Sequence, residues 1–263
     1  MSRPLLDQNR FTSRELAVAA ELTPRNMALL VDSGLAPDPV DGGGGRGNHR
    51  SYDSIGLGAL TLVGAFYKAG MELLVAARLA GAMTEEYALI YGRLPSNLAA
   101  FLQRPHNPRP GYWPWGQALP GVDLDDDYWL HNRLRCHSEV YQPWVALRGD
   151  MVVEIVDQTY VLTKSHDLEV GILSPVGGAV PASPDYRIEG RGSAARIVPI
   201  HEGIRNFDFS VDRESADAYR AQQERYLRAR ENAVTCLRVN VALAIRNGLD
   251  RVTDERAARA LAA

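Results

Sequence analysis

The clearest structural pattern of this chain lies in residues 11–83, which run FTSRELAVAAELTPRNMALLVDSGLAPDPVDGGGGRGNHRSYDSIGLGALTLVGAFYKAGMELLVAARLAGAM. Thr12 and Glu15 have the spacing of a capping box, in which each side chain accepts a hydrogen bond from the backbone N–H of the other residue. A helix should therefore begin near Ser13. The apolar residues of the next two turns give this helix a side that can face a core.

A second helix should begin at Pro24, because Thr23 is a good cap and proline suits the first helical position. Gly34 is a plausible end for it. Three apolar side chains recur at helical spacing and are expected to face the core, namely Met27, Leu30 and Val31. The outer side of the helix then carries Arg25, Asn26 and Ala28.

A glycine-rich loop follows the second helix, with the sequence GGGGRG at residues 42–47. The expected returning strand carries His49, Arg50 and Tyr52. Asp53 or Ser54 can cap a third helix that ends at Gly70, and a fourth helix should cover residues 73–83 and extend toward Tyr91. This order of parts is typical of a winged helix-turn-helix, which presents one helix and one loop to DNA.

The rest of the chain gives weaker signals, and the predicted fold class is α+β. Besides the N-terminal domain, residues 1–92, we expect a proline- and aromatic-rich connection, residues 93–122, an α+β domain of sensory or assembly role, residues 123–210, and a helical region, residues 211–263.

Strand-like runs occur at residues 151–156 and 160–162, and residues 187–189 and 195–200 flank a glycine-containing turn, which predicts a hairpin. After Asp212, apolar residues recur every three, four or seven positions. This spacing predicts one long amphipathic helix that ends near Gly248 and serves either as a dimer interface or as packing for its own domain.

Composition narrows the functional classes. The chain has 263 residues, of which 46% are hydrophobic and 23% charged, and its net charge is −3. Affinity for nucleic acid must therefore come from a local patch. Cys136 and Cys236 form no disulfide framework, and neither a membrane-length apolar run nor a signal-like start is present. We expect a cytoplasmic protein without a membrane partner.

The N-terminal domain resembles the DNA-binding domain of the MerR family of transcription regulators. The matching segments are TSREL at residues 12–16, TPRNM at residues 23–27 and GLAP at residues 34–37, together with Gly47, Arg50, Tyr52 and Gly70. The resemblance implies a homodimeric regulator that reads a palindromic promoter site in double-stranded DNA. It also implies that the second helix enters the major groove while the wing contacts neighbouring phosphates.

The candidate DNA contacts follow from this arrangement. Arginine can bind guanine or phosphate, and asparagine can pair with adenine. The candidates are Arg14, Thr23, Arg25, Asn26, Arg46, His49, Arg50 and Tyr52. The alternative is an ordinary solvated helix face, a loosened surface loop, and a Tyr52 ring that simply packs on the third helix.

A second hypothesis is a protein-interaction adaptor that keeps the fold but has lost DNA binding. The family usually has an arginine and two aromatic residues where this chain has Ala28, Leu29 and Leu30. In addition, residues 1–83 contain eight basic and eight acidic residues, whereas a DNA reader normally shows a basic surplus.

Other chemistry receives little support. His131, Cys136 and His137 do not have zinc-site spacing, and the acidic cluster at residues 123–127 lacks the pattern of a calcium loop, so we expect no metal and no cofactor. The tryptophans at 113, 115, 129 and 144 either line a pocket for a small-molecule effector or form core. No catalytic signature is found, which argues against an enzyme.

Overall fold

The computed structural model describes residues 10–40, 50–93, 151–165, 172–173, 179–180, 184–200, 221 and 224–262. The chain divides into two compact units. The first, here called the helical unit, comprises Met1–Glu85, Gly190–Arg196 and Val241–Ala263, and the second, here called the sheet unit, comprises Glu86–Glu189 and Ile197–Asn240. Helices and strands are both present, with a long helix near the C-terminus, which confirms the α+β expectation at that level.

The helical unit begins with strand β1 (Phe11–Thr12) and helix α1 (Ser13–Ala20). The predicted capping box is present: the N–H of Thr12 donates to Glu15 Oε2 at 2.8 Å, and the N–H of Glu15 donates to Thr12 Oγ1 at 3.2 Å. Leu16 and Ala19 of α1 are buried. Local hydrogen bonding thus sets the start of the helix, and burial of one face holds it in place.

Helix α2 (Pro24–Asp32) also begins where the sequence predicts, because the Thr23 hydroxyl accepts the N–H of Asn26 at 3.2 Å. The chain leaves the helix through Gly34, whose φ of +66° lies in the left-handed region that glycine tolerates. Of the three predicted core residues, Leu30 is fully buried, Met27 is half-buried and Val31 is 44% exposed. The prediction for Val31 is wrong, because α2 buries a narrower stripe than its apolar spacing suggests.

Strand β2 (Ser51–Tyr52) pairs antiparallel with β1, with Phe11 opposite Tyr52. The N–H of Val40 donates to the carbonyl of Ser51 at 2.8 Å. This bond joins the two ends of the glycine-rich segment. The predicted contacts Arg46 and His49 fall within that segment and lie outside the described residues.

Helix α3 (Ser54–Lys68) is capped by Asp53, which accepts the N–H of Gly56 at 2.9 Å. Most residues of α3 are buried. Helix α4 (Leu73–Arg93) follows Gly70, whose φ is +105°. The apolar residues Leu60, Phe66, Leu79 and Met83 are almost completely buried and form the centre of the core.

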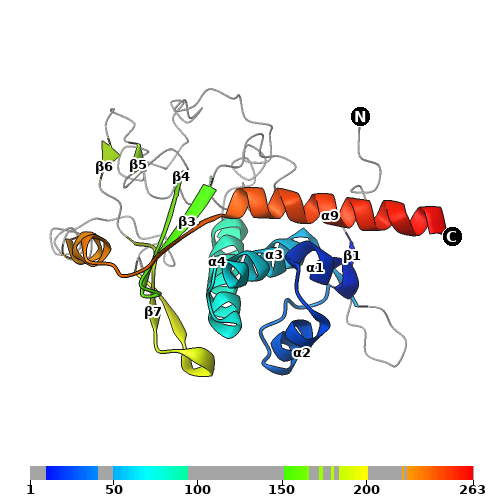
Figure 1. Cartoon of the computed structure of the whole chain (residues 1–263), viewed down its shortest axis with the longest axis horizontal. Coiled ribbons are helices and arrows are strands. Elements are labelled where there is room, and N and C mark those ends of the chain that lie inside the picture. Colours follow the sequence, from blue (N-terminus) through cyan, green and yellow to red (C-terminus); the bar gives the residue numbers. More distant parts are fainter. Residues whose placement is uncertain are drawn as a thin grey trace. The chain divides into compact units, whose positions relative to one another are not determined.

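Helix α9 (Val241–Ala262) packs against α1 and α3, as Figure 1 shows. Two glycines allow this close packing. A Cβ at Gly64 of α3 would lie 2.0 Å from the carbonyl oxygen of Ala20, and a Cβ at Gly248 of α9 would lie 3.0 Å from Thr61 Cγ2 and 3.2 Å from the carbonyl oxygen of Ala19. The end of α1 therefore fits between two helix backbones that carry no side chain at the contact.

The sheet unit is built on a five-stranded sheet with the order β8-β7-β4-β3-β9. Its strands are β3 (Met151–Val156), β4 (Tyr160–Ser165), β7 (Tyr186–Glu189), β8 (Arg196–Pro199) and β9 (Cys236–Asn240). Strand β3 pairs antiparallel with both β4 and β9 and is buried along its whole length. A separate two-stranded sheet joins β5 (Ile172–Leu173) to β6 (Ala179–Val180). The predicted strand regions and the hairpin around Gly190–Gly192 are confirmed.

One buried carboxylate lies on the central strand. Glu154 is 3% exposed, and its Oε1 accepts hydrogen bonds from the Tyr226 hydroxyl at 2.9 Å and from Arg230 Nε at 2.8 Å. Burial, together with the neighbouring charge of Glu154 and this hydrogen bond, raises the pKa of Tyr226 far above its ordinary value, so its hydroxyl stays protonated. These contacts fasten the helical residues 224–231 to the sheet.

The single helix predicted after Asp212 is wrong. Residues 224–231 are helical, but the chain then turns, and Cys236–Asn240 forms strand β9 before α9 begins. The side chain of Asp157 fixes the turn by accepting the N–H of Thr235 at 2.7 Å. Pairing with β3 overrides the helical spacing here, as tertiary context often overrides local preference.

The long C-terminal helix is therefore Val241–Ala262, and it packs within the helical unit. No helix in the described segments combines the length and apolar character needed to cross a bilayer.

Candidate nucleic-acid interface

Helix α2 carries the central candidate residues. Arg25 and Ala28 are exposed, and Asn26 is half-buried. Thr23 is also exposed, but its hydroxyl already accepts the Asn26 N–H. Arg25 lies in the first turn of α2, where the free N–H groups and the positive end of the helix dipole favour an anion such as phosphate.

The second group of candidates lies at the base of the glycine-rich loop. Arg50 is exposed, whereas Tyr52 is 5% exposed and packs beside Gly56, where an added Cβ would lie 3.4 Å from Tyr52 Cβ. The Tyr52 hydroxyl accepts a weak hydrogen bond from the Ser13 hydroxyl at 3.5 Å. Tyr52 thus joins the start of α1 to β2, and it also lines the groove beside α2.

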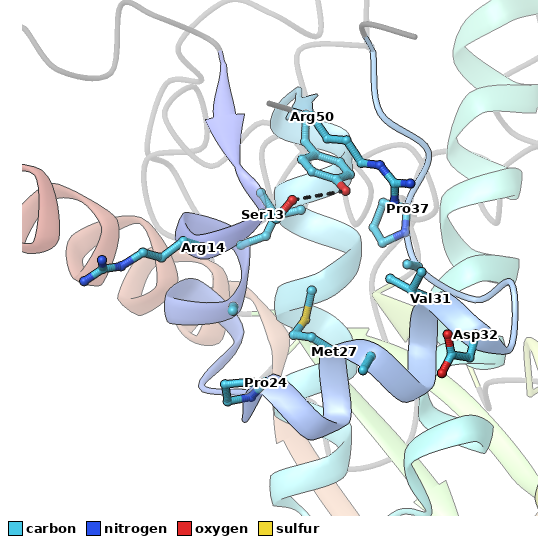
Figure 2. Close-up of a pocket in the computed structure, with 13 residues that line it drawn as sticks. Ser13, Arg14, Pro24, Met27, Val31, Asp32, Pro37 and Arg50 are labelled. Carbon is cyan, nitrogen blue, oxygen red and sulfur yellow. Dashed lines mark hydrogen bonds between the residues drawn. The ribbon is translucent and has the colours of Figure 1, made fainter. Parts of the chain in front are cut away.

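A groove of about 490 Å³ lies between α1 and α2, and Ala36, Pro37, Arg50 and Tyr52 complete its lining (Figure 2). Its walls are mainly apolar and include Leu16, Met27 and Val31, and its polar rim includes Asp32 and Arg50. No ion pair joins Arg25 or Arg50 to another described residue. The face carrying them is not uniformly basic, because Asp32 and Asp38 are also exposed.

Arg14 is directed differently from the other candidates. It contributes to the groove wall, but its guanidinium points away from Met27 and Arg50 in Figure 2. Its Nη2 lies 2.7 Å from Glu255 Oε1 of α9. The structure thus exposes Arg25 and Arg50 beside α2 and the loop, while it pairs Arg14 with the C-terminal helix.

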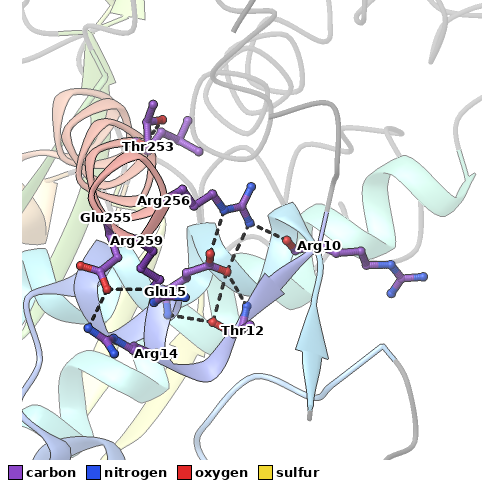
Figure 3. Close-up of polar contacts among 9 residues, drawn as sticks. Arg10, Thr12, Arg14, Glu15, Thr253, Glu255, Arg256 and Arg259 are labelled. Atoms are coloured by element: carbon purple, nitrogen blue, oxygen red, sulfur yellow. Dashed lines mark hydrogen bonds and ion pairs between the residues drawn. The ribbon is translucent and has the colours of Figure 1, made fainter. Parts of the chain in front are cut away.

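A buried ion pair fixes α9 to α1, as Figure 3 shows. Arg256 Nε lies 2.7 Å from Glu15 Oε1, and the two side chains are only 14% and 5% exposed. Arg256 also donates to the carbonyl of Arg10 at 2.7 Å, and its guanidinium lies over the Phe11 ring at 5.2 Å from the centroid. Arg256 therefore binds the carboxylate of an already complete capping box.

A second arginine of α9 binds the other end of α1. Arg251 donates to the carbonyl of Val18 at 3.2 Å and to that of Ala19, and it lies 3.4 Å from Glu21 Oε2. Carbonyls at a helix C-terminus lack partners within the helix, and a cation satisfies them well. Both ends of α1 are thus held by arginines of one helix, a contact that sequence reasoning missed. No local sequence pattern points to these partners, because Arg251 and Val18 lie 233 positions apart in the chain.

The capping carboxylate is ionised in the fold. Burial by itself raises the pKa of Glu15, but hydrogen bonds from Arg256 and Thr12, with the positive charge of Arg256, outweigh burial and hold that pKa below its ordinary value. The pKa of Glu21 is also lowered, first by the hydrogen bond from Lys68. Both carboxylates bind protons less readily in the folded state than in the unfolded state.

This predicts a loss of stability in acid. A carboxylate with a lowered folded-state pKa stabilises fully above its unfolded value, about 4.3, and loses that contribution as the pH falls through the folded value. The free energy of unfolding should therefore fall as the pH drops below about 4.3. Urea unfolding between neutral pH and pH 3 measures this. The variant Glu15→Gln, which can still complete a capping box, should show a shallower decline. An unchanged pH dependence in that variant would contradict the assignment.

The comparisons with known proteins add no relative. No protein-family model matches this sequence, no curated protein matches it, and no solved structure matches it. The resemblance of the N-terminal domain therefore stays an expectation from its residues.

The remaining candidate sites fall largely outside the described residues. This holds for His131, Cys136, His137, the acidic residues 123–127 and the four tryptophans. Among the side chains that the structure does place, no group of three His, Cys, Asp or Glu could hold a metal ion. Cys236 is exposed and is not part of a disulfide.

Proposed function

We propose that the chain is a DNA-binding transcription regulator whose helical unit is a MerR-like winged helix-turn-helix. One observation carries the proposal: α9 covers α1 and α3, whereas the outer face of α2 and Arg50 remain open. In Figure 1, α1 lies between α9 and α2. Within the part of the chain that the structure describes, the helix that would enter the major groove is thus one whose outer side chains stay exposed.

The side chains on this face suit both kinds of DNA contact. Arg25 and Asn26 in the first turn of α2 can reach base edges or phosphates, and Arg50 can bind a neighbouring phosphate. Ala28 and Leu29 are exposed, and apolar side chains of this kind can contact thymine methyl groups. The absence of aromatic residues at these positions therefore still leaves the helix a means of reading sequence.

The assembly follows from the same proposal. A homodimer places two copies of α2 on the two halves of a palindromic site, one helical turn or a multiple apart. A small-molecule effector remains part of the proposal for the region beyond residue 93. With a net charge of −3 for the chain, attraction to DNA depends on the few arginines of this face.

Arg25→Ala is expected to weaken DNA binding. If Arg25 binds a base, its loss should raise the dissociation constant by about five- to 150-fold on the preferred sequence, which corresponds to about 1–3 kcal/mol. The measurement is a gel-shift or anisotropy titration of the full chain, with duplexes from upstream of its own gene and duplexes of random sequence, at several salt concentrations. Arg228→Ala is a matched control, because Arg228 is 78% exposed and lies in the sheet unit.

Two results would count against the proposal. The wild-type chain could show no salt-dependent affinity for any duplex, although phosphate contacts must produce a steep salt slope. Alternatively, Arg25→Ala and Arg228→Ala could bind DNA equally well.

A protein-interaction adaptor is the second candidate, favoured by the apolar surface of α2. Leu29 and Val31 are each 44% exposed, and Val31 borders the mainly apolar groove. Exposed apolar patches commonly mark protein contacts. The same titration separates the candidates, because an adaptor would show no salt-dependent affinity for duplex DNA.

A further inference from the structure

We propose that Glu255 of α9 competes with a DNA phosphate for Arg14, so that the C-terminal helix limits the DNA affinity of the helical unit. This inference rests on the proposed function. It assigns roles to two residues: Arg14 binds either the carboxylate or the DNA backbone, and Glu255 is a positioning residue that acts through Arg14.

The position of Arg14 makes this exchange feasible. Arg14 lies in the first turn of α1, next to Ser13, and it lines the groove beside α2. Its side chain is 71% exposed although its Nη2 lies 2.7 Å from Glu255 Oε1. A solvated guanidinium on a long, rotatable side chain can change partners without disturbing the core.

Glu255 can release Arg14 without becoming an unpaired charge. The same Oε1 that binds Arg14 also accepts the Nε of Arg259 at 2.9 Å, one turn further along α9. Arg259 would stay in place when Arg14 moves to a phosphate. The side chain of Glu255 is 21% exposed, so its remaining charge is also partly hydrated. Little free energy is therefore lost by the carboxylate when the contact opens.

The neighbouring ion pair differs from the pair of Arg14 and Glu255 because it is buried. The pair between Glu15 and Arg256 is buried and also holds the Arg10 carbonyl and the Phe11 ring. Breaking this pair would leave a buried charge without its partner, so the pair keeps α9 docked on α1. Helix α9 can thus remain docked while the neighbouring pair of Arg14 and Glu255, also drawn in Figure 3, opens and closes.

The expected effect is modest, because an exposed ion pair is weak. Removing the carboxylate charge should raise DNA affinity by about two- to fivefold at low salt, the range that corresponds to one surface ion pair. The gain should shrink as salt screens the pair. It should not depend on DNA sequence, because a phosphate contact does not read bases.

The test uses Glu255→Gln in the full chain and a fluorescent random-sequence duplex of about 30 base pairs, long enough for half-sites one turn apart. Asp254→Asn is the matched control, because it removes the same charge from the next position of α9, where Asp254 is exposed. Both variants are also made in the Arg14→Ala background, and circular dichroism confirms that each retains the fold.

The proposal expects Glu255→Gln to bind DNA more tightly than both the wild type and Asp254→Asn, and the gain to vanish when Arg14 is alanine. It is overturned if Glu255→Gln equals Asp254→Asn, or if the gain persists without Arg14. In those cases the wild type still binds DNA and the proposed function stands. If the wild type binds no duplex at any salt concentration, the proposed function and this inference fail together.

Discussion

Arg256→Ala should lower the free energy of unfolding by about 3–5 kcal/mol, because it leaves the Glu15 carboxylate buried without its cation. Glu15 is 4% exposed, and Arg256 is the cation that binds both of its oxygens, at 2.7 and 3.2 Å. The same change removes the hydrogen bond to Arg10 and the contact with the Phe11 ring. Urea unfolding at neutral pH, followed by circular dichroism, measures the loss.

Arg259→Ala is the matched control for this prediction. Arg259 is on the same helix, and its ion pair among the described residues is a part-buried i,i+4 contact with Glu255, so its loss should be about 0.3–0.5 kcal/mol. A second variant, Glu15→Gln combined with Arg256→Ala, should recover part of the stability because it removes the stranded charge. Equal losses for Arg256→Ala and Arg259→Ala would show that the buried pair does not hold α9.

Gly64→Ala should destabilise the chain by at least about 2–3 kcal/mol, since one methyl group would overpack a contact between backbones. The added Cβ would lie 2.0 Å from the carbonyl oxygen of Ala20 and 2.8 Å from its carbonyl carbon. No rotation of a side chain can relieve this overlap, so α3 and α1 must move apart. Thermal and urea unfolding of the full chain measure the effect.

Gly81→Ala in α4 provides the control. An added Cβ there meets nothing within 4 Å, and alanine is better than glycine in a helix interior by about 0.5–1 kcal/mol. The two substitutions are chemically identical and should have opposite signs. Stabilisation by Gly64→Ala would mean that α1 and α3 are not in the close contact described above.

Features encoded over a few residues could be predicted from the sequence. The starts of α1, α2 and α3 follow from Thr12, Thr23 and Asp53, because a cap acts on N–H groups two or three positions away. Gly34 could be predicted at the end of α2 because glycine tolerates the left-handed conformation that ends many helices. Strand β3 and its hairpin partner β4 were recognisable from runs of β-branched residues and a short connection.

Features that depend on distant partners could not be predicted. The residues of β9 have helical spacing, and only pairing with β3, about 80 positions earlier in the chain, makes them a strand. The same limit applies to the candidate nucleic-acid interface, whose contacts also depend on residues distant in the sequence. The ion pair of Arg14 with Glu255 of α9 could not be predicted from local sequence. Val31 was predicted to be buried because its spacing matches that of Leu30 and Met27.

The discontinuous helical unit also sets an order of events during synthesis. Helix α1 needs arginines of α9 at both of its ends, yet 147 residues lie between Arg93 and Val241. At typical rates of translation, roughly 7–30 s separate the emergence of these parts from the ribosome. Throughout that interval the apolar sides of α1 and α3 have no α9 to pack against. A nascent chain stalled before α9 therefore exposes an apolar surface that chaperones would recognise.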